Sequence, residues 1–229
     1  MTETILEARK LAKTYTINNS AILILDAVSL TIGQGEFAVI TGDSGSGKTT
    51  LLTLLSGLDR PTSGRVILAG RDITDLDEDS LARLRNEQIG FVFQAFHLVP
   101  SLNAMENVMF PAELKGDRLA RDKASALLHR VGLWERRHHF PDQLSGGEKQ
   151  RIAICRALIN SPRILFADEP TGNLDSKNSD AIVDLLAELH REQGATLVLA
   201  THSAGIAGRA QRIIRLSDGR LSNGSGSSC

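Results

Sequence analysis

The feature that most restricts the fold of this chain is the octapeptide GDSGSGKT at residues 42–49. It stands between a short apolar run, FAVIT, and a segment of helical composition, TTLLTLLSGL. Glycines let backbone N–H groups turn toward phosphate oxygens, and the start of a helix attracts anions. The spacing Gly-x-x-x-x-Gly-Lys-Thr in this setting therefore predicts a strand, a phosphate-binding loop and a helix.

Two side chains of this loop have specific predicted roles. Lys48 should reach the β- and γ-phosphates of a nucleotide, and the Thr49 hydroxyl should bind Mg²⁺. A Gly/Ser-rich turn that carries Lys-Thr by chance is the alternative, and the flanking strand and helix disfavour it. The residues expected to bind ATP in this segment are Gly42, Asp43, Ser44, Gly45, Ser46, Gly47, Lys48, Thr49 and Thr50.

The composition is that of a globular chain with almost no net charge. Its 229 residues are 41% hydrophobic, enough to bury a core, and the net charge of −1 gives no general attraction to nucleic acid or anionic lipid. No apolar run reaches the length of a membrane span, and the N-terminal MTETILEARK lacks the apolar core of a signal peptide. The two cysteines suggest no disulfide framework, so we expect a cytoplasmic protein with Cys155 in its core.

Short apolar runs alternate with amphipathic segments, which predicts an α/β fold around a largely parallel sheet. The early strands have little helix between them, and the stretch from about 100 to 144 is rich in helix. We therefore expect a phosphate-loop NTPase core with an antiparallel β lobe and an inserted helical lobe. The expected boundaries are one domain at 1–222, a helical subdomain at about 95–160 and a flexible tail at 223–229.

The strands expected from apolar runs are Ile5–Ala8, Ala21–Ser29, Glu36–Thr41, Gly64–Leu68, Ile89–Phe93, Arg163–Ala167, Thr196–Ala200 and Gln211–Leu216. The helices expected from amphipathic patterns are Lys48–Leu58, Ser80–Glu87, Arg121–Val131, Glu148–Asn160 and Ser176–Glu192.

A pair of adjacent carboxylates follows the apolar strand at 163–167. Ligands of open α/β sheets gather at the carboxyl ends of the strands, where Asp168 and Glu169 would stand. Asp168 is expected to hold Mg²⁺, and Glu169 to act as general base on the attacking water. An acidic strand-to-loop turn is common, but here the pair occurs in a chain that also has a phosphate loop.

The string LSGGE at residues 144–148 is the third motif. A Ser-Gly-Gly helix start is itself a good anion site. In combination with the other two motifs, it makes nearly the whole chain resemble the ATP-binding subunits of ABC transporters. The resemblance implies that Ser145, Gly146, Gly147 and Glu148 complete the ATP site of an opposite subunit in a head-to-tail dimer.

Other positions take their expected roles from the same resemblance. Tyr15 would stack on adenine, with a core tyrosine as the alternative, and Gln94 would contact Mg²⁺ and the attacking water. Asp175 would belong to a loop that crosses the dimer interface, and His202 would sense the γ-phosphate. The family usually has Asp after this histidine, whereas this chain has Ser203, so a contact that depends on that aspartate is not expected here.

A narrower resemblance is carried by GLDRPTSG, GFVFQAFHLVPSLNAMENV and FADEPTGNLD, which look like the lipoprotein-release and macrolide-export group. It implies a second copy of the chain and integral membrane permease subunits as partners, at the cytoplasmic face of the inner membrane. Motion would reach the permease through the segment after Gln94. The apolar residues that could dock it, or could equally be core, are Phe96, Leu98, Val99 and Pro100.

Two other functions remain open at this point. A soluble ABC-type ATPase that acts on DNA or ribosomes is disfavoured by the single cassette, the absence of sustained heptads and the near-neutral charge. A regulatory or cell-division cassette that only binds ATP is disfavoured by intact Lys48, Glu169 and His202. The sequence identifies neither the cargo nor the direction of transport.

Overall fold

A computed structural model describes residues 3–18 and 20–222 of the chain. The chain divides into two compact units, which consist of residues 1–85 with 196–229 and of residues 86–195. We refer to them as unit 1 and unit 2. The tail expected at 223–229 lies outside the described residues.

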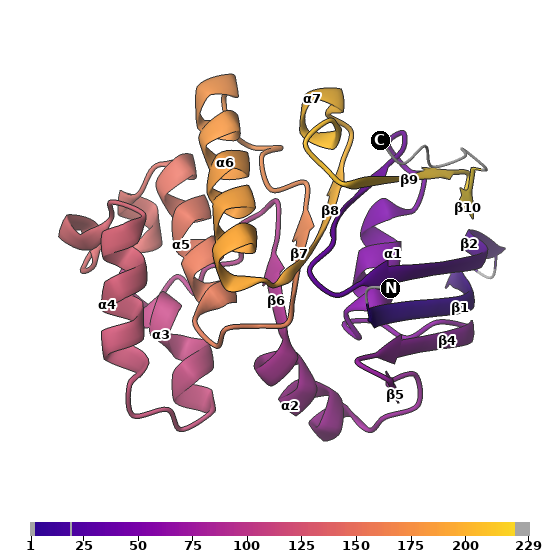
Figure 1. Cartoon of the computed structure of the whole chain (residues 1–229), viewed down its shortest axis with the longest axis horizontal. Helices are drawn as coiled ribbons and strands as arrows, with labels where there is room; N and C mark the ends of the chain where they lie inside the picture. The colour runs from indigo at the N-terminus through magenta and orange to yellow at the C-terminus, as the bar shows by residue number, and fades with distance from the viewer. Residues whose placement is uncertain (1–2, 19, 223–229) are drawn as a thin grey trace. The chain divides into compact units, whose positions relative to one another are not determined.

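An antiparallel sheet forms the first part of unit 1, with strand order β2-β1-β4-β5. Its strands are β1 (Thr4–Ile17), β2 (Ser20–Gly33), β4 (Ser63–Leu68) and β5 (Arg71–Asp72) (Figure 1). Apolar residues of β1, such as Leu6 and Leu11, are fully buried. The sequence predicted the hairpin as two much shorter strands, because the apolar alternation is lost where bulges occur. Lys10 and Ala27, with φ near +49°, mark two of these irregular positions.

Parallel strands form the second part of unit 1. β3 (Phe37–Thr41) lies between β8 (Thr196–Thr201) and β9 (Arg212–Ser217), and the short β10 (Arg220–Leu221) pairs with β9. β8 is buried along its whole length and β3 along almost all of it, which is typical of parallel strands covered on both faces. The helices of this part are α1 (Lys48–Leu55) and α7 (Ala204–Ala207), and α2 (Glu78–Gln88) leads along the chain toward unit 2.

Unit 2 combines a pair of parallel strands, β6 (Ile89–Val92) and β7 (Ile164–Asp168), with helices. The helices are α3 (Ala104–Leu114), α4 (Ala120–Arg130), α5 (Gly146–Leu158) and α6 (Ser176–Gln193), with 3₁₀ turns at Trp134–Arg136 and Pro141–Gln143. The helix-rich stretch predicted from about 100 to 144 is confirmed. α3, for which the sequence gave no boundaries, begins with a capping box between Asn103 and Glu106.

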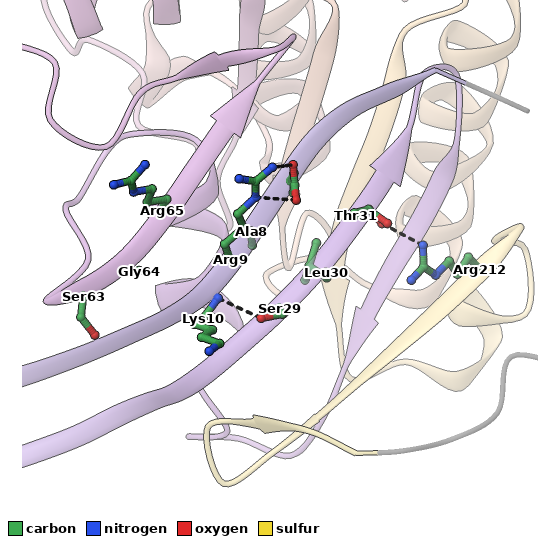
Figure 2. A pocket seen from close by; sticks show the side chains of 11 residues that line it. Ala8, Arg9, Lys10, Ser29, Leu30, Thr31, Ser63, Gly64, Arg65 and Arg212 are labelled. Carbon is green, nitrogen blue, oxygen red and sulfur yellow. Dashed lines mark hydrogen bonds and ion pairs between the residues drawn. The ribbon is translucent and has the colours of Figure 1, made fainter.

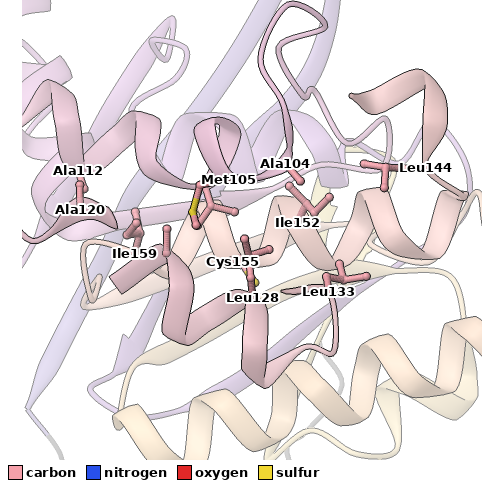
Figure 3. Packing of buried hydrophobic residues seen from close by; sticks show 12 residues of the cluster. Ala104, Met105, Ala112, Ala120, Leu128, Leu133, Leu144, Ile152, Cys155 and Ile159 are labelled. Atoms are coloured by element: carbon pink, nitrogen blue, oxygen red, sulfur yellow. The ribbon is translucent and has the colours of Figure 1, made fainter. Parts of the chain in front are cut away.

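The core of unit 2 is an apolar cluster between α3, α4 and α5 (Figure 3). Cys155 lies in it with 1% of its surface exposed, as expected, and burial raises the pKa of its thiol to about 12. Leu98 packs against the same cluster, whereas Pro100 is exposed, so the apolar residues after Gln94 are not all core. Among the described residues, no helix combines the length and the apolar character that a membrane crossing requires.

Candidate nucleotide site

The phosphate loop connects β3 to α1 in unit 1, as predicted. Gly45 and Gly47 have φ of +81° and +100°, values that L side chains rarely adopt. The Lys48 side chain is almost fully buried, and its ammonium donates to the carbonyl oxygens of Gly42 (2.8 Å) and Asp43 (2.9 Å). Since an ammonium has three donors, one N–H remains for a phosphate oxygen.

Close packing requires the glycine at position 42, and one buried hydroxyl of the loop fits a phosphate group. A Cβ at Gly42 would stand 2.1 Å from the Leu216 carbonyl oxygen and 2.6 Å from Ser46 Oγ, so the loop leaves no room for a side chain there. Ser46 Oγ is buried and has no hydrogen-bond partner within the described part of the chain. A buried hydroxyl of this kind is costly unless a ligand or water satisfies it.

Tyr15 lies near the start of α1, but not in the core. It is 38% exposed, and its hydroxyl donates to Asp59 Oδ2 at 2.7 Å. The side chain of Thr50, in the first turn of α1, also contacts this hydroxyl. The alternative of a core tyrosine is therefore wrong, and the exposed ring remains a candidate surface for a base.

His202 directly follows β8. The last residue of β8 pairs with the last residue of β3. The register pairs Thr41 with Thr201, so the exposed His202 and the first residue of the phosphate loop leave adjacent strands at the same edge. Ser203, the departure from the family pattern, is the N-cap of α7 without a side-chain cap hydrogen bond. Its backbone N–H donates to Thr201 Oγ1 at 3.1 Å.

The carboxylate pair stands at the carboxyl end of β7 in unit 2. Asp168 is 8% exposed and is the last residue of β7, which has the predicted length but begins and ends one residue later than predicted. Glu169 is half-buried and has φ of +43°, a left-handed conformation that is uncommon for a residue with a side chain. Backbone of this kind occurs at functional sites, but it also occurs at the bulge positions Lys10 and Ala27 of this chain.

Gln94 is held by the loop that follows Glu169. Asn173 Nδ2 donates to the Gln94 carbonyl at 2.9 Å, and Gln94 Nε2 makes a long contact of 3.5 Å with Asn173 Oδ1. A Cβ at Gly172 would lie 2.6 Å from Gln94 Nε2. This arrangement leaves the amide oxygen of Gln94 as the atom that can bind a metal or water.

The signature segment begins α5 through a capping box. Glu148 Oε2 accepts from the backbone N–H and the hydroxyl of Ser145, both at 2.8 Å, while Ser145 Oγ accepts from the Glu148 N–H at 3.3 Å. Burial would raise the pKa of Glu148, but these hydrogen bonds and the nearby Arg136 and Arg151 lower it. The pattern Ser-x-x-Glu predicts such a box, and the sequence analysis gave Glu148 only a role in the opposite subunit.

Three of the predicted elements are neighbours within unit 2. A Cβ at Gly146 would lie 3.3 Å from Leu174 Cδ2 and 3.8 Å from Phe96 Cζ. Leu174 precedes Asp175, which stands before α6 and whose carbonyl accepts from the Ser179 N–H at 2.9 Å. The start of the signature helix therefore packs against the loop of Asp175 and against the segment after Gln94.

Arg156 of α5 is a residue that the sequence analysis missed. Its guanidinium donates to the carbonyl oxygens of Phe96, at 2.9 Å, and His97. These two residues have φ of +60° and +50°, so the arginine stabilises a left-handed turn directly after Gln94. No local pattern indicates this contact, because the partners are about sixty residues apart in the chain.

A hollow of unit 1 lies elsewhere, on the antiparallel sheet (Figure 2). It measures about 950 Å³ and contains Arg9 and Arg65, which are direct cross-strand partners. Like charges in this position repel each other. Glu7 contacts Arg9 at 2.6 Å and Asp72 lies 3.8 Å from Arg65, so both charges are compensated. None of the predicted nucleotide-binding residues lines this hollow.

The phosphate loop on a buried strand, with the histidine of the adjacent strand at the same edge, defines a phosphate-loop nucleotide-binding protein. The family described as "ABC transporter" matches residues 25–172. The chain belongs to this family, and the predicted family and ABC ATPase fold are confirmed. The chain is thus an ABC-type ATPase.

Curated relatives agree with the narrower resemblance. The chain is 47% identical over 222 residues to the lipoprotein-releasing system ATP-binding protein LolD 1 of Caulobacter vibrioides, with 96% of this chain and 95% of that protein covered. It is 47% identical over 228 residues to the macrolide export ATP-binding/permease protein MacB of Hyphomonas neptunium. That match covers 99% of this chain but only 35% of MacB, so the chain spans about a third of this relative.

A solved structure gives the same result for the fold. The dimeric structure of MJ0796, described as a bacterial ABC transporter cassette, matches with a TM-score of 0.90 and 42% identity, over 96% of this chain and 97% of that chain. A second dimeric structure of MJ0796, described as a post-hydrolysis state bound to ADP and Pi, matches with a TM-score of 0.89.

Proposed function

We propose that this chain binds and hydrolyses ATP to energise a membrane permease, in a complex for export, lipoprotein release or mechanical transmission. The observation that carries the proposal is the buried Lys48 ammonium, which has two of its three donors fixed by loop carbonyls. The third donor and the loop N–H groups can bind the phosphate oxygens of a nucleoside triphosphate. Relatives named as ATP-binding proteins support the same conclusion.

The catalytic roles follow from the chemistry of each side chain. Lys48 and the loop amides hold the phosphates and balance charge on the leaving oxygens. Glu169 accepts a proton from the attacking water, and His202 contacts the γ-phosphate. Tyr15 offers its exposed ring to the adenine.

A magnesium ion fits the donor set that the sequence predicts. By the family resemblance, Thr49, Gln94 and Asp168 would supply a hydroxyl, an amide oxygen and a carboxylate, which are the oxygen ligands that this ion prefers. Bound there, Mg²⁺ would neutralise charge on the β- and γ-phosphates. The long contact of the Gln94 N–H₂ group with Asn173 Oδ1, at 3.5 Å, supports this role, because it leaves the amide oxygen for the ion.

Two copies of the chain would meet head to tail, with Ser145, Gly146 and Gly147 of one copy facing the ATP held by Lys48 of the other. The dimeric state described for the MJ0796 cassette supports this arrangement. Because each nucleotide would contact both copies, ATP favours the closed dimer by linkage. Loss of the γ-phosphate removes those contacts and lets the dimer open.

The transported substrate would not pass through this chain itself. We propose integral permease subunits as partners, with this chain at the cytoplasmic face of the inner membrane. The relative MacB is named as an ATP-binding/permease protein, which supports a permease partner for the matching third of that protein. The half-buried Phe96 and the exposed Pro100 are the residues we expect nearest to it.

A mixing experiment tests both hydrolysis and the shared site. Lys48→Ala and Ser145→Arg should each abolish ATPase activity, since one removes the phosphate cation and the other obstructs the interface. A mixed dimer contains one site with both lesions and one with neither. If one intact site suffices, mixing restores part of the activity, and if both must act, ATP still binds at the intact site.

A matched control separates the interface from general effects of an added charge. Ser101 is an exposed serine of unit 2 outside the predicted site, so Ser101→Arg should keep normal activity. Normal turnover by Ser145→Arg as an isolated monomer would refute the role in the opposite subunit. Unchanged ATP affinity and turnover in Lys48→Ala would refute the phosphate loop as the site.

A further inference from the structure

The hydroxyl of Tyr15 is bound by a carboxylate that has no role in the function proposed above. Asp59 Oδ2 accepts from Tyr15 Oη at 2.7 Å, and Asp59 Oδ1 accepts from Lys13 Nζ at 2.7 Å. The backbone N–H of Arg60 also donates to Oδ1, at 2.7 Å. Both carboxylate oxygens are thus engaged, and Tyr15 is one of their three partners.

The backbone on both sides of Asp59 is fixed. The N–H groups of Leu58 and Asp59 donate to the Thr53 carbonyl of α1, at 2.9 and 3.2 Å. A few residues later, the N–H of Thr62 donates to the Ala12 carbonyl of β1 at 2.8 Å. The carboxylate is therefore anchored between the helix that follows the phosphate loop and the strand that carries Tyr15.

Lys13 covers one face of the Tyr15 ring. The two residues stand two positions apart on β1 and so share a face of the strand. Lys13 Nζ lies 4.8 Å from the ring centroid, and the lysine side chain is only 12% exposed. Tyr15 as a residue is 38% exposed, so the face of the ring opposite Lys13 is the one that we take as available for a flat group to stack on.

The charges of this cluster fix the direction of the hydrogen bond. Burial would raise the pKa of Asp59, but the hydrogen bonds from Lys13, Tyr15 and Arg60 outweigh it and lower the pKa. Burial and the adjacent Asp59 raise the pKa of Tyr15 to about 12. At neutral pH the carboxylate is ionised and the phenol is neutral, so the hydroxyl donates and Asp59 accepts.

We propose that Asp59 is a positioning residue for the nucleotide base, which holds the Tyr15 ring through its hydroxyl so that the open face stacks on the base. The inference rests on the function proposed above. The contact of Thr50 with the Tyr15 hydroxyl connects the ring to the first turn of α1. The base surface is thereby set at a fixed place relative to the phosphate loop. Loss of the carboxylate should weaken recognition of the base and leave recognition of the phosphates intact.

Two ligands measured by calorimetry separate these contributions. ATP has a base, whereas tripolyphosphate has the phosphates alone. Asp59→Asn should weaken ATP binding by about threefold to tenfold relative to tripolyphosphate, which corresponds to the loss of one well-oriented aromatic stack. The ratio of the two affinities cancels the general effect of removing one negative charge. Asp75→Asn removes an exposed charge from the same unit outside this cluster and should leave the ratio unchanged.

A double-mutant cycle tests whether Asp59 acts through the tyrosine hydroxyl. Tyr15→Phe keeps the ring but removes the group that Asp59 holds, so it should lower the affinity ratio by a similar factor. In the Tyr15→Phe background, Asp59→Asn should then have little further effect. If the two substitutions lower the affinity ratio independently, so that the factors of the single variants multiply in the double variant, the inference is overturned.

The chain contains one tyrosine, so carbon-13 labelled tyrosine gives a direct second readout. In NMR spectra without nucleotide, Asp59→Asn should shift the ring signals, whereas Asp75→Asn should not. ATP should shift these signals further, and tripolyphosphate should not. If the wild-type chain fails to bind ATP, the proposed function falls. If it binds ATP and Asp59→Asn leaves the affinity ratio unchanged, the positioning role alone is overturned.

Discussion

Gly172→Ala is predicted to disable the site through one side chain. A Cβ at Gly172 would lie 2.6 Å from Gln94 Nε2 and 3.0 Å from Gln94 Cδ. An unstrained contact between heavy atoms needs about 3.5 Å, so the Gln94 amide must move by roughly 0.9 Å. Displacements of about 1 Å at a reacting centre cost on the order of 10²-fold in rate. We therefore expect turnover to fall about 10- to 100-fold.

The same substitution should leave the fold almost unchanged. Gly172 has no left-handed φ, and the atom that an added Cβ meets is the end of a flexible side chain. We expect the free energy of unfolding to change by less than about 1 kcal/mol. Steady-state ATPase assays and urea unfolding of the same preparations measure both quantities. Gly205→Ala is a suitable control, since its Cβ would meet nothing closer than Ser203 Oγ at 3.9 Å.

The dependence on Gln94 can be tested directly. If Gly172→Ala acts only by moving this amide, it should have no further effect on turnover in a Gln94→Ala background. A further loss in that background, or normal turnover in the single variant, would refute the reasoning. An altered unfolding transition would instead show that the loop backbone had moved.

Three other predictions concern separate parts of the chain. Glu169→Gln should lower turnover about 10²- to 10⁴-fold, since it removes the proposed base, and should keep ATP binding, so that ATP traps a dimer in size-exclusion chromatography. Arg156→Met should lower the free energy of unfolding by about 2–4 kcal/mol, because the Phe96 and His97 carbonyls lose a charged donor. Urea unfolding measures this loss, and Arg118→Met, at an exposed position, is the control. Above pH 10 the unfolded chain loses its tyrosine proton, whereas the folded chain keeps it to about pH 12, so the free energy of unfolding should fall across this window. Urea unfolding between pH 9 and 12 measures the slope, which Tyr15→Phe should reduce.

The fold was most predictable from the sequence where burial is continuous. β3 and β8 were placed to within a residue, because fully buried parallel strands are unbroken apolar runs. β1 was predicted at only Ile5–Ala8 but extends to Ile17. Its second half has polar, half-exposed residues, and it stays paired because β2 lies beside it. A contact of that kind leaves no periodic signal in either strand.

The candidate site shows the same limit at the level of single residues. Lys48 and Glu169 stand in contiguous motifs, so the chemistry of each could be predicted from its neighbours in the chain. Asp59 and Arg156 act on residues 44 and about 60 positions away, and an isolated Asp or Arg has no pattern that identifies its partner. The sequence therefore predicted the residues expected to contact the nucleotide, and missed the residues that bind the Tyr15 hydroxyl and the turn after Gln94.

The glycines of these motifs meet two different physical requirements, which the sequence alone does not separate. Gly45 and Gly47 have left-handed φ, so any side chain at these positions would strain the backbone of the phosphate loop. Gly146 and Gly172 have ordinary φ, and there the missing Cβ makes room for Leu174 and for Gln94. In unit 2 the signature helix, the loop of Asp175 and Gln94 are thus kept in contact by the absence of side chains. A substitution at the first pair acts on the backbone itself, whereas one at the second pair acts on the neighbour that it displaces.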